Sequence, residues 1–142
     1  MTIGHARKIR LPRIHDARGN LTFVEGGRHV PFDIRRVYYL YDIPSGATRA
    51  GHAHKALEQV LIAVSGSFEV VLDTGRARRS FVMNKPDCGL YIPPMTWREI
   101  RNFSAGSACV VLASIRFDED DYYRDYGVFV RAARRRKRAA RA

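Results

Sequence analysis

Short apolar runs divided by turn-forming residues recur along most of this 142-residue chain. The runs are rich in Val, Ile, Tyr and Phe, and Gly, Pro, Asp and Ser separate them, which is typical of β-strands. Many short strands at this spacing predict a β-sandwich or a closed barrel. We expect strands at Leu21–Glu25, Ile34–Tyr41, Leu57–Val64, Ser67–Asp73, Gly89–Ile92, Trp97–Phe103 and Ala108–Ile115, and a hairpin turn at Gly66.

The C-terminal part of the chain has a different pattern. Asp118–Tyr126 and Val128–Arg138 are predicted to be helical, with Asp118 as the N-cap. The length fits one domain, and no repeat or linker divides it. We therefore expect a single domain over residues 1–130, followed by a basic C-terminal tail over residues 131–142.

Two motifs in the middle of the chain resemble the divided metal site of the metal-binding cupins. They read Gly46-x5-His52-x-His54-x4-Gln59-x6-Gly66 and Pro93-x4-Arg98-x3-Asn102. In those cupins two His and a Glu come from the first motif, and a third His comes from the second. Gln59 is a weak neutral ligand, and Arg98 keeps its positive charge and would repel a divalent ion. The spacing predicts an all-β cupin, a small antiparallel β-barrel or jelly roll with a short C-terminal helical segment, and no bound metal.

Two histidines without a metal are candidates for acid–base chemistry, because imidazole titrates near neutrality. Residues two apart in a strand face the same way, so His52 and His54 project together. By the same rule Arg36, Tyr38 and Leu40 share one face of their strand, and a tyrosine of this run can line a cavity. The alternative is that the two histidines are ordinary polar residues at a strand edge.

The net charge of +11 is concentrated at the C-terminus. The last twelve residues hold seven Arg or Lys and no acid, which leaves +4 on the rest of the chain. Such a run can bind nucleic acid or an anionic surface, or it can be a solvated, fraying helix end. We expect the solvated helix end, and we do not expect nucleic acid as a partner.

The chain has no segment that predicts a membrane or an export route. No apolar run approaches the ~20 residues that a membrane span needs, and the basic N-terminus lacks the apolar region of a secretory signal. Cys88 and Cys109 fit no metal or redox spacing, so we expect free buried thiols. These features predict a cytoplasmic protein.

Five stretches of the chain resemble the sugar 3,4-ketoisomerases, which are cupins that act on dTDP-4-keto-6-deoxyglucose in the making of unusual deoxysugars. In the order of that family they are RGNLTFVEG, VPFDIRRVYYLYDIP, TRAGHAHKALEQVLIAVSGS, GLYIPPMTWREIRNFS and VLASIRFDEDDYYRDY. The resemblance covers most of residues 18–126. It implies an isomerase that moves the substrate carbonyl from C4 to C3 through an enediol without a cofactor, and it implies a homodimer.

The resemblance also implies roles for individual residues. His52 and His54 would be the catalytic acid and base, and Tyr38 would be a supporting hydroxyl that polarises the substrate or relays a proton. Gln59 would orient a histidine or a sugar hydroxyl. Which histidine acts at C3 stays open.

Three arginines are candidates for substrate binding. Arg49 and Arg98 would hold the diphosphate or stabilise the enediolate, because guanidinium presents a fixed fork of donors to oxyanions; either could instead be a solvated or surface-paired charge. Arg18 stands at one of two positions that the resemblance links to the configuration of the product at C4, and Arg98 stands at the other. Galacto-type members have Arg and His there, and gluco-type members have Tyr and Arg. This chain combines one residue of each pattern, and we expect the gluco product because Arg98 belongs to the cupin motif.

Three other functions fit parts of this sequence. A dTDP-sugar 3,5-epimerase also uses a metal-free barrel and a histidine base. A metal-dependent cupin oxygenase is opposed by Gln59 and Arg98. A non-catalytic sugar-binding or DNA-binding cupin would have only the basic tail in its favour, since no helix-turn-helix segment is recognisable.

Overall fold

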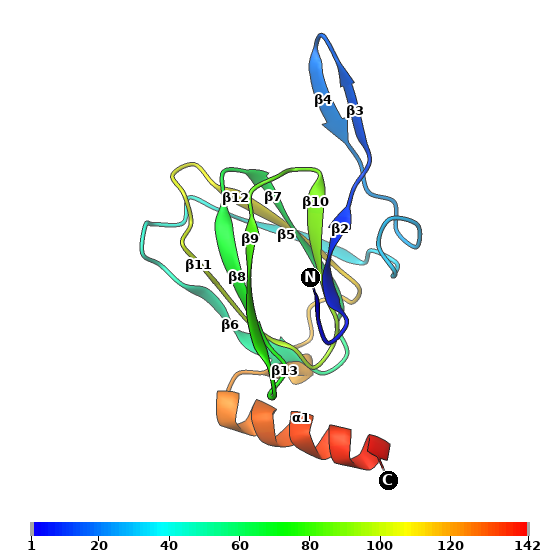
Figure 1. The fold of residues 1–142 in the computed structure, drawn as a ribbon, viewed down its shortest axis with the longest axis vertical. Coiled ribbons are helices and arrows are strands. Elements are labelled where there is room, and N and C mark those ends of the chain that lie inside the picture. Colours follow the sequence, from blue (N-terminus) through cyan, green and yellow to red (C-terminus); the bar gives the residue numbers. More distant parts are fainter. Residues whose placement is uncertain (1, 142) are drawn as a thin grey trace.

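Two antiparallel sheets pack face to face as a jelly roll in the computed structural model, which describes the backbone of residues 2–141 and the side chains of residues 2–136 (Figure 1). The six-stranded sheet has the order β1 (Thr2–Ile3), β2 (Ala6–Arg10), β10 (Cys88–Ile92), β7 (Gln59–Ser65), β12 (Ala108–Ala113) and β5 (Arg36–Tyr41). The five-stranded sheet has the order β13 (Tyr122–Tyr123), β6 (Arg49–His54), β11 (Trp97–Arg101), β8 (Phe68–Asp73) and β9 (Arg78–Met83). The expected cupin-like jelly roll is confirmed, as two separate sheets rather than a closed barrel.

The main hydrophobic core fills the space between the two sheets. Its members are inward-facing residues of both sheets, including Leu61, Phe68, Leu72, Ile92 and Val111. A second cluster covers the outer face of the six-stranded sheet, where Leu11, Val30 and Phe32 pack on Val60 and Ile62 of β7. Strand β7 is therefore buried on both faces, which explains why its sequence is apolar almost throughout rather than alternating.

Gly66 makes the turn between β7 and β8, as the sequence predicts. Its φ angle is +65°, in the left-handed region that favours glycine. A Cβ atom there would lie 2.4 Å from Oγ of Ser104 and 2.9 Å from Cα of Ser107. Glycine is thus required at this position by both the backbone conformation and the available space.

The expected strands are confirmed with shifted ends, and additional strands are present. The expected Leu57–Val64 and Trp97–Phe103 correspond to β7 and β11, whereas the expected Leu21–Glu25 begins earlier in the structure, as β4 (Gly19–Thr22). Strands β2 and β9 were not predicted, because Arg and Lys interrupt their apolar pattern. Their backbones nevertheless pair with β10 and β8, since strand pairing depends on backbone hydrogen bonds and not on composition alone.

The C-terminal prediction needs correction in its first half. Instead of a helix over Asp118–Tyr126, the chain forms a short 3-10 turn, Glu119–Asp121, and then β13, which pairs with β6. The side chain of Asp118 does cap the turn, accepting a hydrogen bond from the N–H of Asp120. The helix α1 follows as one element, Tyr126–Arg141, so the expected division between residues 130 and 131 falls inside it.

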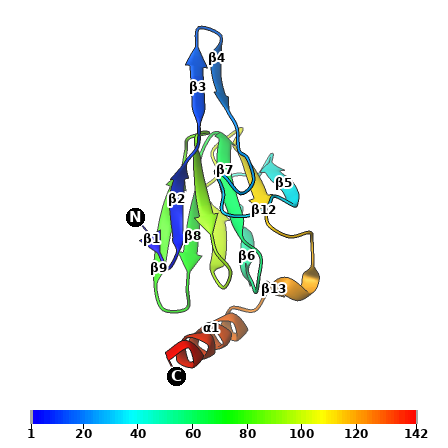
Figure 2. The same ribbon diagram turned by 90° about the vertical axis from the view of Figure 1, so that its right-hand side faces the viewer.

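Helix α1 and the hairpin of β3 (Arg13–Asp16) and β4 lie at opposite ends of the molecule (Figures 1 and 2). Phe129 anchors α1: its side chain is fully buried against Ala53 and Trp97. The hairpin, by contrast, projects beyond the sheets, and Ile14 and Leu21 on it are 57% and 55% exposed.

Candidate active site

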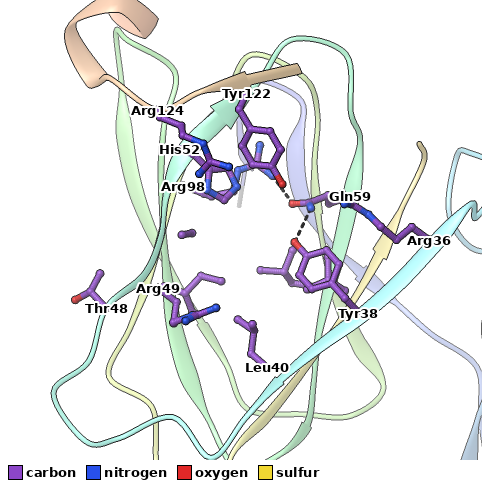
Figure 3. Close-up of a pocket in the computed structure, with 14 residues that line it drawn as sticks. Arg36, Tyr38, Leu40, Thr48, Arg49, His52, Gln59, Arg98, Tyr122 and Arg124 are labelled. Carbon is purple, nitrogen blue, oxygen red and sulfur yellow. Dashed lines mark hydrogen bonds between the residues drawn. The ribbon is translucent and has the colours of Figure 1, made fainter. Parts of the chain in front are cut away.

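A cavity of about 440 Å³ opens between the two sheets, and Figure 3 shows side chains from both sheets pointing into it. Strands β5, β6, β7, β11, β12 and β13 all contribute to its wall. The lining residues are Arg36, Tyr38, Leu40, Thr48, Arg49, Ala50, His52, Gln59, Leu61, Arg98, Ile100, Val111, Tyr122 and Arg124. The cavity therefore brings together most of the candidates from the sequence: His52, Tyr38, Gln59, Arg49 and Arg98.

A local irregularity in β6 directs its side chains at the cavity. Arg98 of β11 pairs with His52, whereas Glu99 pairs with Ala50, so Gly51 is an extra residue on β6. Gly51 and Ala50 both have left-handed φ angles, 77° and 70°. Bulges of this kind re-aim side chains near functional sites, and a left-handed alanine is a strained residue that only a well-packed surrounding maintains.

The two histidines project from the same side of β6, as strand geometry predicts. Their ring centroids are 4.8 Å apart, while Ala53 between them packs against Trp97 on the other side. Their surroundings differ, however. His52 lines the cavity, whereas His54 is fully buried, is absent from the cavity wall and lies next to the wall residue Tyr122, with ring centroids 4.4 Å apart.

Both imidazoles are held in the neutral form. Burial, with the positive charge of Arg98 and the neighbouring His54, lowers the pKa of His52 to about 3. Burial, with the charges of Arg98, Arg36 and Arg124, lowers the pKa of His54 to about 2. A neutral imidazole has a free lone pair, so each ring is available as a proton acceptor at neutral pH.

Asp121 is a buried neighbour of His54 that the sequence analysis did not identify. Its Oδ2 atom lies 2.9 Å from Nδ1 of His54, and its Oδ1 atom accepts a hydrogen bond from the N–H of Ala56 at 2.7 Å. Asp121 stands among the acids of the segment FDEDDYY, and nothing in their sequence distinguishes it from its neighbours. Only the pairing of β13 with β6 brings it to His54.

A chain of hydrogen bonds runs from Arg98 through Gln59 to Tyr38. The Arg98 guanidinium is 1% exposed, donates to Oε1 of Gln59, and donates to the backbone carbonyl of Thr96 at 2.9 Å. Gln59 in turn donates from Nε2 to the hydroxyl oxygen of Tyr38 at 2.8 Å. Arg98 is thus a buried, oriented donor rather than a surface-paired charge.

The direction of these hydrogen bonds determines what the Tyr38 hydroxyl can do. Because the Tyr38 oxygen accepts from Gln59, its own proton is free to be donated toward the cavity. Burial is the largest influence on the pKa of Tyr38 and raises it, so the phenol stays protonated near neutrality. Tyr38 is therefore placed as a neutral hydrogen-bond donor to a substrate oxygen.

Guanidinium groups give the cavity a positive potential. Besides Arg49 and Arg98, the wall includes Arg36, which the sequence placed on the face of Tyr38 without a role in the site, and Arg124, which the sequence analysis did not identify. Arg124 lies over the ring of Tyr122, 4.2 Å from its centroid. None of the described residues that line the cavity is acidic. A cavity of this charge and size suits an anionic, diphosphate-bearing ligand.

Arg18 lies apart from the other candidates. It is in the turn of the β3–β4 hairpin, its side chain is 89% exposed, and it pairs with Asp16 at 2.7 Å. It does not line the cavity of its own chain.

In the part of the chain that the structure describes, no three His, Cys, Asp or Glu side chains gather in a way that would hold a metal ion. At the position of the third cupin histidine, Arg98 occupies the wall with its cationic fork. The donor set therefore does not fit a divalent ion.

Comparison with known proteins identifies the family of this chain. The family described as "WxcM-like, C-terminal" (FdtA) matches residues 5–134. The chain belongs to this family. A curated relative, the TDP-4-oxo-6-deoxy-α-D-glucose-3,4-oxoisomerase of Aneurinibacillus thermoaerophilus, is 42% identical over 121 residues, which are 85% of this chain and 87% of the relative.

Solved structures of the family agree in fold across nearly the whole chain. The 3,4-ketoisomerase QdtA of Thermoanaerobacterium thermosaccharolyticum, in complex with TDP, superposes with a TM-score of 0.93 at 39% identity, covering 95% of this chain and 98% of QdtA. The TDP-quinovose 3,4-ketoisomerase WlaRB of Campylobacter jejuni gives a TM-score of 0.88 at 44% identity, covering 91% and 99%. These relatives are TDP-sugar 3,4-ketoisomerases, in agreement with the resemblance found in the sequence and not with the 3,5-epimerase alternative.

On helix α1, the exposed residues among those described include Arg131, Arg134, Arg135 and Arg136. Among the described residues, no helix combines the length and the apolar character needed to cross a membrane.

Proposed function

We propose that this chain is a 3,4-ketoisomerase that converts dTDP-4-keto-6-deoxyglucose into the corresponding 3-keto sugar. The observation that carries the proposal is a cation-lined cavity between the two sheets, into which one sheet contributes a neutral histidine, His52, and the other a protonated phenol, Tyr38. The curated relative named for TDP-4-oxo-6-deoxy-α-D-glucose and the TDP-quinovose 3,4-ketoisomerase support a TDP-linked sugar as the substrate class.

The reaction needs a base, an acid and a group that stabilises negative charge. The net oxidation level of the sugar does not change. The neutral His52 accepts the proton from C3, and the electron pair moves to the C4 oxygen, where Tyr38 donates a hydrogen bond. Protonation of that oxygen gives the 3,4-enediol. Return of a proton to C4 and loss of the proton from the C3 hydroxyl complete the transfer, so protons balance and no redox cofactor is required.

The arginines divide between binding the diphosphate and supporting the reacting atoms. Arg98 is held by hydrogen bonds to Gln59 and to the carbonyl of Thr96. It supports the reacting carbons of the sugar indirectly, because it orients Gln59, which in turn orients Tyr38. Arg49 lies at the more exposed part of the wall, where a diphosphate can be reached from solvent. Guanidinium forks suit phosphate oxygens in particular.

The test is direct. Purified protein is incubated with dTDP-4-keto-6-deoxyglucose, and the sugar protons are followed by NMR; we expect the C3 proton signal to disappear and a new C4 proton signal to appear. Inversion at C3 or C5 without movement of the carbonyl would instead show a 3,5-epimerase, and an unchanged spectrum with tight TDP binding would show a non-catalytic sugar-binding protein.

We further propose that catalysis is independent of metal, because no three His, Cys, Asp or Glu side chains of the described residues are arranged to hold an ion, and the carboxylate of Asp121 is already engaged by His54 and Ala56. Activity should therefore survive exhaustive treatment with EDTA. Loss of activity and its recovery on adding one specific divalent metal would overturn this mechanism.

A homodimer is part of the proposal. The β3–β4 hairpin exposes Ile14 and Leu21, and the edge strand β5 exposes Tyr39 and Tyr41 at 62% and 60%. An isolated two-stranded hairpin is marginally stable in water, so a second copy is the natural cover for these surfaces. In such a dimer Arg18 would contact substrate only if the hairpin reached the cavity of the second copy. Light scattering on the wild type and on Leu21→Asp tests this; a monomeric wild type would contradict it.

The gluco product is proposed because Arg98 lies in the cavity wall whereas Arg18 is outside it in the same chain. The similarity to a TDP-quinovose 3,4-ketoisomerase supports this choice, since quinovose is 6-deoxyglucose. Trapping the product with a 3-aminotransferase and measuring the H3–H4 and H4–H5 couplings distinguishes the products. Large couplings fit gluco, and small ones would show the galacto product.

Cytoplasmic location is proposed from the thiols. Cys88 and Cys109 are unpaired; Cys109 is buried as expected, whereas Cys88 is only partly buried. Burial raises the pKa of Cys109 to about 12, which keeps it an unreactive thiol.

A further inference from the structure

One buried carboxylate has no role in the chemistry proposed above. Asp121 is 6% exposed and ends the short turn that leads into β13. Both of its oxygens face the segment at the end of β6: Oδ2 contacts Nδ1 of His54, and Oδ1 accepts from the N–H of Ala56. Its backbone carbonyl also accepts a hydrogen bond from the N–H of Lys55 at 2.8 Å. Asp121 is therefore attached to this segment at three points.

These contacts determine which nitrogen of His54 carries the proton. An ionised carboxylate only accepts hydrogen bonds, and the backbone N–H of Ala56 can only donate. With an ionised carboxylate at Asp121, Nδ1 of His54 is the donor to Oδ2, which leaves the lone pair of the neutral ring on Nε2.

The Nε2 atom of His54 is buried and has no hydrogen-bond partner among the described residues. Two residues of the cavity wall adjoin the ring: His52, with ring centroids 4.8 Å apart, and Tyr122, with ring centroids 4.4 Å apart. A buried acceptor without a partner costs free energy, and such groups persist where function needs them.

We propose that Asp121 is a positioning residue, which holds His54 in the tautomer whose Nε2 is an unprotonated acceptor beside His52 and Tyr122. The assignment of the tautomer rests on the contacts of an ionised Asp121 with a neutral His54, whereas its consequence for turnover rests on the proposed ketoisomerase function.

Asp121→Asn tests this sharply because the amide has nearly the shape of the carboxylate but only one oxygen. The N–H of Ala56 cannot change its role, so the amide oxygen faces Ala56 and the NH2 group faces Nδ1 of His54. The ring must then accept at Nδ1 and carry its proton on Nε2, the wrong tautomer. We expect kcat to fall about 10²-fold or more, with KM changed less than about threefold.

The tautomer is read from imidazole ¹⁵N NMR at pH 7, with the His54 signals assigned by their loss in His54→Asn. Asp120→Asn is the matched control, since it makes the same substitution at an exposed carboxylate of the same turn. We expect the wild type and this control to carry the His54 proton on Nδ1 and to have the same kcat, and Asp121→Asn to carry it on Nε2.

Several results would overturn the proposal. One is a wild-type His54 protonated on Nε2. Another is an Asp121→Asn variant that loses turnover with an unchanged tautomer, which would indicate a structural role only. A third is an inverted tautomer with kcat within about threefold of the wild type. If Asp121→Asn does not fold, the wild-type spectrum still decides the tautomer, and Asp121→Ser replaces it in the kinetic comparison. If the wild type does not isomerise the sugar, the proposed function fails, while the tautomer is still measured independently.

Discussion

The cavity and helix α1 use the same side chain in opposite ways. In the cavity, Arg98 is buried and its guanidinium is fixed by Gln59 and by the carbonyl of Thr96. On α1, Arg131 and Arg135 are exposed, and the helix is attached through the buried Phe129 rather than through its charges. A buried guanidinium with fixed acceptors is an oriented donor in a medium of low dielectric constant, whereas an exposed one is screened by water and salt. Charge alone therefore does not identify the functional arginines; burial and partners do.

The largest expected effect is at the two histidines of β6, of which His52 lines the cavity and His54 lies behind its wall. His52→Asn and His54→Asn should each lower kcat by about two to four orders of magnitude, the usual contribution of a general acid or base. Affinity for TDP should be largely retained, because the diphosphate is bound by arginines. Steady-state kinetics and calorimetric titration with TDP measure the two quantities. Near-normal turnover in either variant would remove that histidine from the mechanism.

The contrast between buried and exposed arginines predicts different values of kcat/KM for two Arg→Lys variants. The expected loss is smaller than that of the histidine variants. Arg98→Lys keeps the positive charge but loses the fork that reaches Gln59 and Thr96, so the Tyr38 hydroxyl loses its orientation. We expect kcat/KM to fall about 10²-fold. Arg135→Lys on α1 is the matched control and should leave kcat/KM unchanged. Equal effects in the two variants would show that burial does not distinguish these arginines.

The pH dependence of kcat/KM tests the electrostatics of the cavity. An unperturbed histidine base, with a pKa near 6.5, would lose activity as the pH falls through that value. Burial and the neighbouring guanidiniums lower the pKa of His52 to about 3, so the base stays deprotonated at lower pH. We expect kcat/KM to vary less than about threefold between about pH 8 and about pH 5. An acid limb near pH 6.5 would show that His52 is far less desolvated than its surroundings indicate.

The smallest effect is expected at the C-terminus. Truncation after Arg131 keeps Phe129, which anchors the helix, and removes the exposed Arg134, Arg135 and Arg136, so ketoisomerase activity should stay within about twofold. Activity and light scattering of the truncated protein are the measurements. Loss of both activity and the proposed dimer would show that the end of α1 belongs to the dimer interface. The exposed arginines of the helix would then be functional, contrary to the contrast drawn with the buried Arg98.

The sequence by itself determined the fold class and about half of the cavity. Strand alternation placed Arg36, Tyr38 and Leu40 on one face and put His52 and His54 on the same side of β6, because these relations depend only on the local two-residue period. The spacing of the two motifs predicted that Arg98 and His52 belong to one site, and the two residues are paired on the neighbouring strands β11 and β6 of the same sheet.

Tertiary structure alone decided the rest of the site. Asp121 is 67 residues from His54 along the chain and meets it only because Tyr122 and Tyr123 add a strand to the edge of β6. Local propensity favoured a helix there, but the backbone pairing with β6 prevailed over it, as tertiary context commonly does. Arg124 reaches the cavity wall by the same pairing. Arg18, in contrast, has a suitable side chain for the site but sits on a hairpin that projects away from it, and no local pattern in the sequence encodes that direction.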